Sequence, residues 1–240
     1  MITNIETYLN SLSEDITILN ISRNGLKYLP DLTRFKNLKK LNCPDNELTS
    51  LPNLPSTLEE LNCSNNKLTF LSFLPQNLKA LNCSINKLTS LILPENLLSL
   101  ECSNNKLTSL QTLPQNLKAL YCYNNKLTSL QTLPQNLNIL YCSNNKLTSL
   151  ILPENLEELY FHNNPIYEIV INNNLIKIKQ NIQIFNNFRY LYYCLKFKNH
   201  FRKWLWEKVR EPKIKKLYDP NYLVENLGDK DLEIVLYDWK

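Results

Sequence analysis

The chain has 240 residues, of which 43% are hydrophobic and 20% are charged, and these proportions are typical of a soluble globular protein. It contains no run of 18 or more apolar residues, which excludes a membrane-spanning helix. Its formal net charge of +5 at pH 7 arises after residue 164, because residues 1–164 carry 13 basic and 13 acidic side chains. The opening segment has neither the basic start nor the apolar stretch of a secretory signal, so we expect a cytoplasmic protein with reduced cysteines.

Residues 1–15, MITNIETYLNSLSED, precede the first copy of a pattern that then recurs along the chain. A stack of repeated units leaves its apolar core open at each end, so the ends of such a stack need a cap with a polar outer face. We therefore expect residues 1–15 to form an N-terminal cap.

Residues 16–171 hold about eight units of the pattern L-x-x-L-x-C-x-x-N-x-L, spaced 19 to 22 residues apart. Apolar and polar residues alternate within a unit, as in Leu120, Tyr121, Cys122 and Tyr123, which indicates a strand with one buried face. One short strand cannot bury that face alone, whereas parallel strands about 4.8 Å apart share a continuous core. The pattern therefore predicts a solenoid. The units begin at Ile16, Leu38, Leu58, Leu78, Leu97, Leu117, Leu137 and Leu156.

The pattern resembles that of the leucine-rich-repeat family, and the recurrent L-P-x-N-L linker, as in LPQNLKAL, is most like the short repeats of bacterial secreted effectors. Proline fixes φ and donates no hydrogen bond, so a proline on each return path predicts an extended path rather than a helix. We expect a mostly β α/β solenoid with parallel strands on the concave face, an extended convex side and a helical C-terminal region. The prolines are Pro55, Pro75, Pro94, Pro114, Pro134 and Pro153.

An asparagine stands at position nine of every unit, where the strand turns into the loop. Its amide both donates and accepts, so a buried asparagine can bond the backbone of its own turn and of the next one. We interpret these residues as a structural ladder in which each bond contributes about 1 kcal/mol. They are Asn24, Asn46, Asn66, Asn86, Asn105, Asn125, Asn145 and Asn164.

Six cysteines occupy position six, where two sibling units have Ile21 and Phe161. Interchange with these residues indicates an apolar position in which cysteine acts as a small hydrophobe. A disulfide ladder is the alternative, since neighbouring strands bring Cα atoms within bonding range, but it needs an oxidising compartment. A line of thiols does not have the clustered spacing of a zinc site, so we expect no metal. The cysteines are Cys43, Cys63, Cys83, Cys102, Cys122 and Cys142.

Positions three, five and seven should point to the concave face, because positions four and six point inward. This face changes from small and amide side chains to aromatic ones halfway along the repeats. Tyrosine is enriched in binding surfaces, although tyrosines on adjacent strands also stack on one another and support a sheet. The candidate contact residues are Tyr121, Tyr123, Ile139, Tyr141, Tyr160 and His162.

Five lysines follow ladder asparagines and should line one edge of the solenoid, either as a solvated edge that resists aggregation or as an anion-binding one. They are Lys67, Lys87, Lys106, Lys126 and Lys146.

Residues 172–240 form a separate, mainly helical region. Apolar residues recur at intervals of three and four from about Ile182 to Val209, which predicts an amphipathic helix, with shorter helices after Pro220 and from Asp231. Residues 189–216 carry ten basic and two acidic side chains, so nucleic acid or an acidic membrane surface is an alternative partner. The C-terminal sequence resembles predicted proteins of giant DNA viruses of amoebae, which implies the cytoplasm of an infected host cell as the location.

No catalytic motif accompanies these features. With only two glycines the chain has no phosphate-binding loop, dinucleotide fingerprint or G-x-S-x-G motif. His162 and His200 lie in different regions, and Cys194 on the expected helix has no base at motif spacing. We expect no enzyme and no cofactor. The family resemblance implies a monomeric scaffold whose concave face binds an unidentified protein, with recruitment of a host ubiquitin ligase as a further alternative.

Overall fold

The computed structural model describes residues 2–110, 112–130, 132–170, 172, 174–196, 203, 207, 211 and 212, with side chains described as far as residue 189 in the last helix. Contacts divide the chain into two compact units, residues 1–185 and 186–240. The first unit holds the repeats and is described below. Of the second unit, the structure describes the end of one helix and a few further residues.

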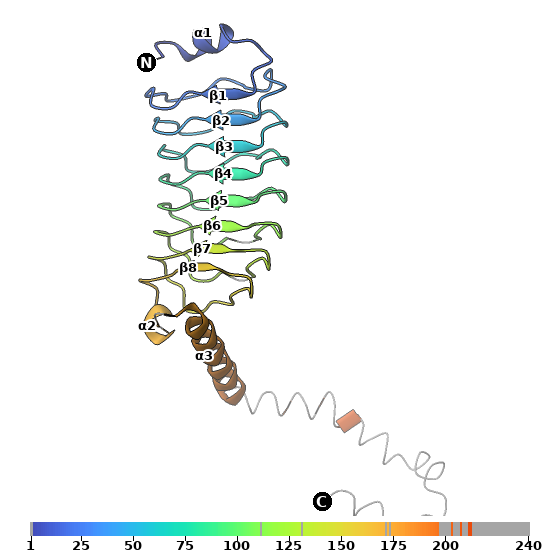
Figure 1. Cartoon of the computed structure of the whole chain (residues 1–240), viewed down its shortest axis with the longest axis vertical. Coiled ribbons are helices and arrows are strands. Elements are labelled where there is room, and N and C mark those ends of the chain that lie inside the picture. Colours follow the sequence, from blue (N-terminus) through green and yellow to red (C-terminus); the bar gives the residue numbers. More distant parts are fainter. Residues whose placement is uncertain are drawn as a thin grey trace, which may run out of the picture. The chain divides into compact units, whose positions relative to one another are not determined.

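Eight short strands form one parallel sheet in the first unit (Figure 1). Strand order follows chain order, and neighbouring strands pair without a shift in register, so that Leu41 lies opposite Leu61 and Leu61 opposite Leu81. The predicted parallel solenoid is confirmed. The elements are α1 (Ile5–Asn10), β1 (Ile18–Asn20), β2 (Lys40–Asn42), β3 (Glu60–Asn62), β4 (Ala80–Asn82), β5 (Ser99–Glu101), β6 (Ala119–Tyr121), β7 (Ile139–Tyr141), β8 (Glu158–Tyr160), α2 (Tyr167–Val170) and α3 (Leu175–Lys196).

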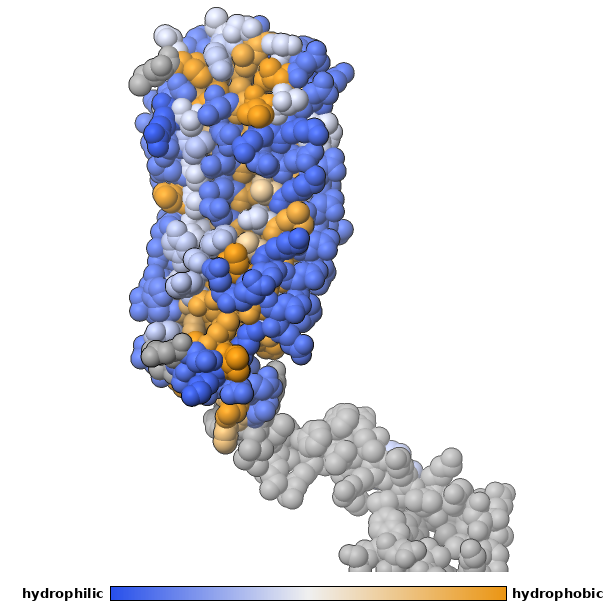
Figure 2. Space-filling view, in the orientation of Figure 1, coloured by the Kyte–Doolittle hydropathy of each residue, from blue (hydrophilic) through white to orange (hydrophobic). Residues whose placement is uncertain are grey.

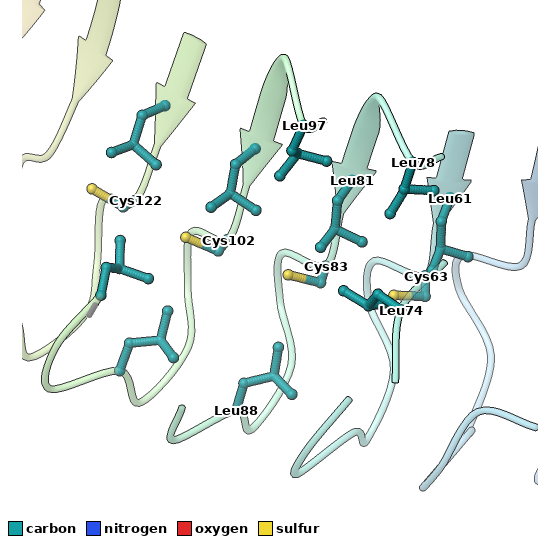
Figure 3. Close-up of a cluster of buried hydrophobic side chains, with 14 of the residues drawn as sticks. Leu61, Cys63, Leu74, Leu78, Leu81, Cys83, Leu88, Leu97, Cys102 and Cys122 are labelled. Carbon is teal, nitrogen blue, oxygen red and sulfur yellow. The ribbon is translucent and has the colours of Figure 1, made fainter. Parts of the chain in front are cut away.

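The core is built from positions one, four, six and eleven of each unit. In the second repeat, which begins at Leu38, these residues are Leu38, Leu41, Cys43 and Leu48, and none of them is exposed to solvent. Figure 3 shows the same arrangement in the following units, with the thiols and leucines of successive turns stacked behind the strands. Removing most of one such leucine side chain costs about 2–5 kcal/mol.

Each unit continues to bond its neighbours after its three-residue strand ends. The Cys43 amide donates to the Asn62 carbonyl at 2.8 Å, and the Asp45 amide donates to the Ser64 carbonyl at 3.1 Å. The Glu47 amide donates back to Leu26 at 2.8 Å. Buried backbone groups must be paired, so these bonds allow a tight turn to close without a helix.

Position eight of every unit has a left-handed backbone, with φ between 50° and 56°. Asparagine and aspartate tolerate this conformation better than other residues with a side chain, which explains why they occupy six of the eight positions. A β-branched side chain is least suited to it, so Ile85 is the outlier. The residues are Arg23, Asp45, Asn65, Ile85, Asn104, Asn124, Asn144 and Asn163.

The convex side is extended, as the recurrent prolines predict. The six prolines are buried, and each carbonyl accepts a bond from the amide three residues later, as in Leu58 to Pro55 at 3.1 Å. Each proline therefore begins a tight turn that leads directly into the next unit.

The N-terminal segment covers the first unit with α1, whose Ile5 and Leu9 are buried. The Asn4 side chain accepts bonds from the amides of Glu6 and Thr7, so it caps the start of this helix. The amide of Ile2 donates to Asn24 Oδ1 at 2.7 Å and takes the place of a preceding unit in the asparagine ladder.

The eighth unit has Pro165 at position ten, and its position-eleven residue, Ile166, is buried like the leucines at that position in earlier units. In other units the amide at position ten donates to the preceding turn, as Lys146 does to Leu127 at 2.8 Å. Proline has no amide hydrogen, so Ile166 donates to Leu147 instead, and α2 follows.

Helix α3 begins at Leu175, before the predicted start near Ile182. The side chain of Asn174 accepts bonds from the amides of Ile176 and Lys177 at 2.9 and 3.3 Å and so caps the helix. The sequence LIKIKQN alternates with period two, so the first turns of the helix lack the spacing of three and four that predicts a helix. Within the part of the chain that the structure describes, no helix is long and apolar enough to span a membrane.

Candidate interaction surface

The N-terminal half of the concave face is mostly polar and internally bonded, apart from Ile18 in β1, which is 60% exposed. At position five, Asn62 Oδ1 accepts bonds from the backbone amide and hydroxyl of Ser64 at 3.1 and 2.8 Å, and Asn82 accepts the same pair from Ser84. Lys40 pairs with Glu60 at 2.6 Å across β2 and β3. These groups satisfy one another, so this half offers few free contacts.

Three tyrosines, Tyr121, Tyr141 and Tyr160, occupy position five of β6, β7 and β8, and we call them the tyrosine row. The ring centroids of Tyr121 and Tyr141 are 4.9 Å apart, and those of Tyr141 and Tyr160 are 4.4 Å apart. Such pairs contribute about 0.5–1.5 kcal/mol each beyond their buried area. The tyrosines therefore do stack on one another and support the sheet. They also remain accessible, because Tyr160 is 52% exposed and the other two rings are half-buried.

Two carboxylates flank the tyrosine row. Glu158 Oε2 accepts a bond from the Tyr141 hydroxyl at 2.8 Å, which raises the pKa of Tyr141 to about 12. Burial raises the pKa of Tyr121, and the charges of Glu101 and Glu158 raise it further. Among the described residues, neither glutamate forms an ion pair. The row therefore lies beside two carboxylates that form no ion pair with the described residues, although Glu101 accepts a bond from Asn82 Nδ2 at 2.8 Å.

The other candidate contact residues differ in accessibility. Tyr123 and Ile139 are half-buried, whereas His162 is exposed and its Nδ1 lies 2.9 Å from Ser143 Oγ. At position seven, Ser103 and Ser143 are only 1% and 4% exposed, so they offer little surface to a partner. Both lie next to Tyr123 at the same position of the neighbouring unit, and Ser143 also has His162 on its other side.

The position-nine asparagines each bind two units. Asn66 Nδ2 donates to the carbonyls of Cys43 and Cys63 at 3.0 and 3.1 Å, while its Oδ1 accepts from the Leu48 amide at 2.9 Å. Each asparagine therefore bonds the backbone of its own repeat and of the preceding repeat, whereas the sequence analysis expected bonds to the following repeat. The same set of bonds recurs at Asn86, Asn105, Asn125, Asn145 and Asn164.

A second ladder at position eight was missed by the sequence analysis. Asn124 Nδ2 donates to Asn104 Oδ1 at 2.8 Å, and Asn163 bonds Asn144 in the same way at 2.6 Å. Asn65 donates to Asp45 at 2.7 Å. The recurrent N-N pair was the available signal, because its first asparagine occupies the left-handed position. Ile85 interrupts this ladder, since its side chain cannot hydrogen-bond.

The six position-six cysteines are free and buried. Burial raises the pKa of each thiol, to about 12 for Cys43 and Cys142. The thiolate is the reactive form, so these side chains are chemically inert while the chain is folded. Within the described residues, no group of three or more His, Cys, Asp or Glu side chains is placed to hold a metal ion.

The lysine edge is mostly solvated. Lys67 pairs with Glu47 at 2.9 Å, and both side chains are about half-exposed, so the pair contributes at most about 1 kcal/mol. Lys87, Lys106, Lys126 and Lys146 are exposed.

The alternatives that involve the C-terminal region fall mostly outside the described residues. Cys194 lies in α3, but its side chain is not among those described. Most of the basic segment 189–216 and the shorter predicted helices lie beyond the description as well. Binding of nucleic acid or membrane, recruitment of a ligase and the viral resemblance stay predictions.

No protein-family model matches the chain, and no curated protein does. Among solved structures, the leucine-rich-repeat domain of a Shigella effector is 34% identical with a TM-score of 0.56, and the match covers 67% of this chain and 73% of that domain. YopM from Yersinia enterocolitica is 32% identical with a TM-score of 0.54, over 65% of this chain and 39% of YopM. YopM from Yersinia pestis, a leucine-rich effector protein, is 34% identical with a TM-score of 0.55, over 63% and 49%.

These matches agree with the geometry of the repeat: a three-residue strand, an asparagine ladder and an extended convex path. Leucine-rich-repeat solenoids are in general scaffolds for protein–protein interaction, which use their extended concave surfaces. The chain belongs to the leucine-rich-repeat family.

Proposed function

We propose that the concave face binds a protein partner through the tyrosine row, and that Glu101 and Glu158 favour a partner surface with an exposed lysine or arginine. The observation that carries this proposal is the row itself, three adjacent rings of which Tyr160 is 52% exposed, beside two carboxylates without a cationic partner among the described residues. The half-buried Tyr123 and Ile139 and the exposed His162 lie on the same half of the face.

The chemistry of this surface explains the preference for a basic partner. A cation over a tyrosine ring gains about 0.5–2 kcal/mol, most when water is excluded. Carboxylates around the rings add long-range attraction, which increases the rate of encounter and falls with salt. The rings are held by their neighbours, so little side-chain entropy is lost on binding.

The test is affinity capture from host lysate with the full chain and a triple variant, Tyr121→Ala, Tyr141→Ala and Tyr160→Ala. We expect the variant to remain folded and to lose the captured partner. Asn42→Ala with Asn62→Ala, at the same strand position in the other half, is the matched control. Phe70→Ala with Phe73→Ala controls for loss of exposed aromatic surface, since these side chains are 55% and 100% exposed and lie away from the tyrosine row. A folded triple variant that captures the same proteins would show that the row is not the site.

The charge part of the proposal has its own test. Glu101→Gln with Glu158→Gln keeps the size of both side chains and removes their charge. With the captured partner, this variant should bind more weakly at low salt and should show a smaller loss of affinity as salt rises. An unchanged salt dependence would mean that the carboxylates do not contact the partner.

A further inference from the structure

The last strand of the sheet has a neighbour on one side only. Strand β8 pairs with β7, and no other strand among the described residues lies beyond it. In earlier units the amides at positions six and eight donate to the following unit, as Cys142 does to Tyr160 at 2.7 Å and Asn144 to His162 at 2.9 Å. The equivalent amides after β8 belong to Phe161 and Asn163, and an added strand would supply their acceptors.

The helices that follow β8 close the core, and Lys179 of α3 donates to the carbonyls of Glu154 and Leu156 just before the strand. Among the described residues, however, no strand pairs with the free side of β8. Phe161, Ile166, Val170 and Ile182 are at most 3% exposed, and the ring of Tyr167 packs on Phe161 at 5.0 Å. In contrast, Leu159 is half-buried, while the seven leucines at the same position in earlier units are at most 2% exposed. The last position-four leucine therefore lacks the neighbour that covers the others.

A hollow of about 400 Å³ lies along this edge, within the size range of peptide and ligand clefts. Its floor is the backbone and side chains of residues 157–162, and its far wall includes Tyr167, Leu175 and Ile178. In Figure 2 apolar side chains gather at both ends of the solenoid, and the middle of this face is more hydrophilic. The hollow therefore combines charged and polar side chains, such as Glu157 and Glu158, with the apolar side chains of Leu175 and Ile178.

The charge pairs between neighbouring strands indicate which side chains a ninth strand would carry. At position two, Glu59 lies between Lys39 and Lys79, at 3.3 and 2.6 Å, and at position three Lys40 pairs with Glu60. Acidic and basic residues thus alternate between neighbouring strands in that region. The unit of β8 presents Glu157 and Glu158 at these two positions, which favours basic residues in the next strand.

We propose that the edge of β8 binds an extended segment of a partner protein, which adds a ninth strand parallel to β8. The segment has two basic residues opposite Glu157 and Glu158, a leucine that packs on Leu159, and an aromatic or amide residue beside Tyr160. Its amides donate to the carbonyls of Glu157 and Leu159, and its carbonyl accepts from Phe161, in the pattern that joins the earlier units. This edge adjoins the concave opening of the tyrosine row, and Glu158, Tyr160 and His162 border both surfaces.

The chain itself offers a matched pair of probes. A peptide of residues 58–68, LEELNCSNNKL, with Cys63→Ser, has glutamates at positions two and three. The same peptide with Glu59→Lys and Glu60→Lys differs only in these two charges. Binding of each labelled peptide to the full chain is measured by fluorescence anisotropy, and the amide signals of the chain are followed by NMR.

We expect the lysine peptide to bind at least tenfold more tightly than the glutamate peptide, and to shift the amide signals of Leu159, Phe161 and Asn163. Asn62→Pro in the lysine peptide removes the amide that donates to Leu159, so binding should be lost. In the chain, Glu157→Lys with Glu158→Lys should reverse the preference between the two peptides.

Tyr121→Ala should leave peptide binding unchanged, because Tyr121 lies in β6, two strands from β8, and only Tyr141 bonds Glu158. This result would separate the edge from the proposed concave site. Several results would overturn the proposal: no binding of the lysine peptide, equal binding of the two peptides, equal binding of the proline peptide, or shifts confined to the tyrosine row.

Discussion

Replacement of Ile85 by asparagine should stabilise the protein. Ile85 occupies the left-handed position with φ of 53° and is 51% exposed, so its side chain contributes little burial. The left-handed conformation costs an ordinary residue about 1–2 kcal/mol, more for a β-branched one and less for asparagine. An asparagine there also lies between Asn65 and Asn104 of the adjoining units, so it can join the bonded pair of Asp45 and Asn65 to the bonded pair of Asn104 and Asn124 in the position-eight ladder. We expect the free energy of unfolding to rise by about 1–2 kcal/mol.

The measurement is urea unfolding of the full chain followed by circular dichroism, with the m-value used to check that the folded and unfolded states are unchanged. Ile151→Asn is the matched control, because Ile151 is 58% exposed and is not at a left-handed position. It should change stability by less than about 0.5 kcal/mol. Asn124→Ile should destabilise by about the amount that Ile85→Asn gains. If Ile85→Asn were no more stable than wild type while the controls behaved as stated, backbone strain at position eight would not be the cause.

Further predictions concern the position-nine asparagines, the thiols and the tyrosine row. Asn105→Leu should lower the free energy of unfolding by about 3 kcal/mol or more, because the carbonyls of Cys83 and Cys102 and the amide of Leu88 lose a buried partner; an effect below 1 kcal/mol would contradict this. Cys102→Ser should destabilise more than Cys102→Ala by about 1–3 kcal/mol, since the serine hydroxyl would be buried in an apolar position. The six position-six thiols should react with a thiol reagent only as the chain unfolds, and fast labelling of any of them at neutral pH would argue against their burial. The raised pKa of Tyr141 stabilises the folded state fully below pH 10, and this contribution is lost as pH rises to about 12; Glu158→Gln should lower that pKa in a tyrosinate absorbance titration and flatten this part of the stability profile.

The repeat made the architecture predictable. Eight units with the same apolar spacing can share one core only by stacking in register, so strand direction, strand order and the inward position of Leu41 or Cys43 follow from the pattern. The proline on each return path likewise predicts an extended convex side, because it removes a donor and fixes φ. These are local requirements that each unit meets with its own residues.

The ends of the stack were less predictable, because contacts between segments decide them. The start of α3 after Asn174 depends on a capping side chain within an alternating sequence, and the altered hydrogen bond of the eighth unit depends on the missing amide hydrogen of Pro165. The burial of Ser103 and Ser143 follows from the neighbouring rungs and not from their own position in the unit.

The sequence by itself determined the period, the strand face and the identity of the residues on the concave side, because a period-two strand in a repeated unit leaves each side chain only one direction. Only the tertiary structure decided how those residues meet. The row of Tyr121, Tyr141 and Tyr160, the Glu158 carboxylate on Tyr141 and the open edge of β8 each depend on distances between different turns of the solenoid. Such distances are a property of the stack and not of any single unit.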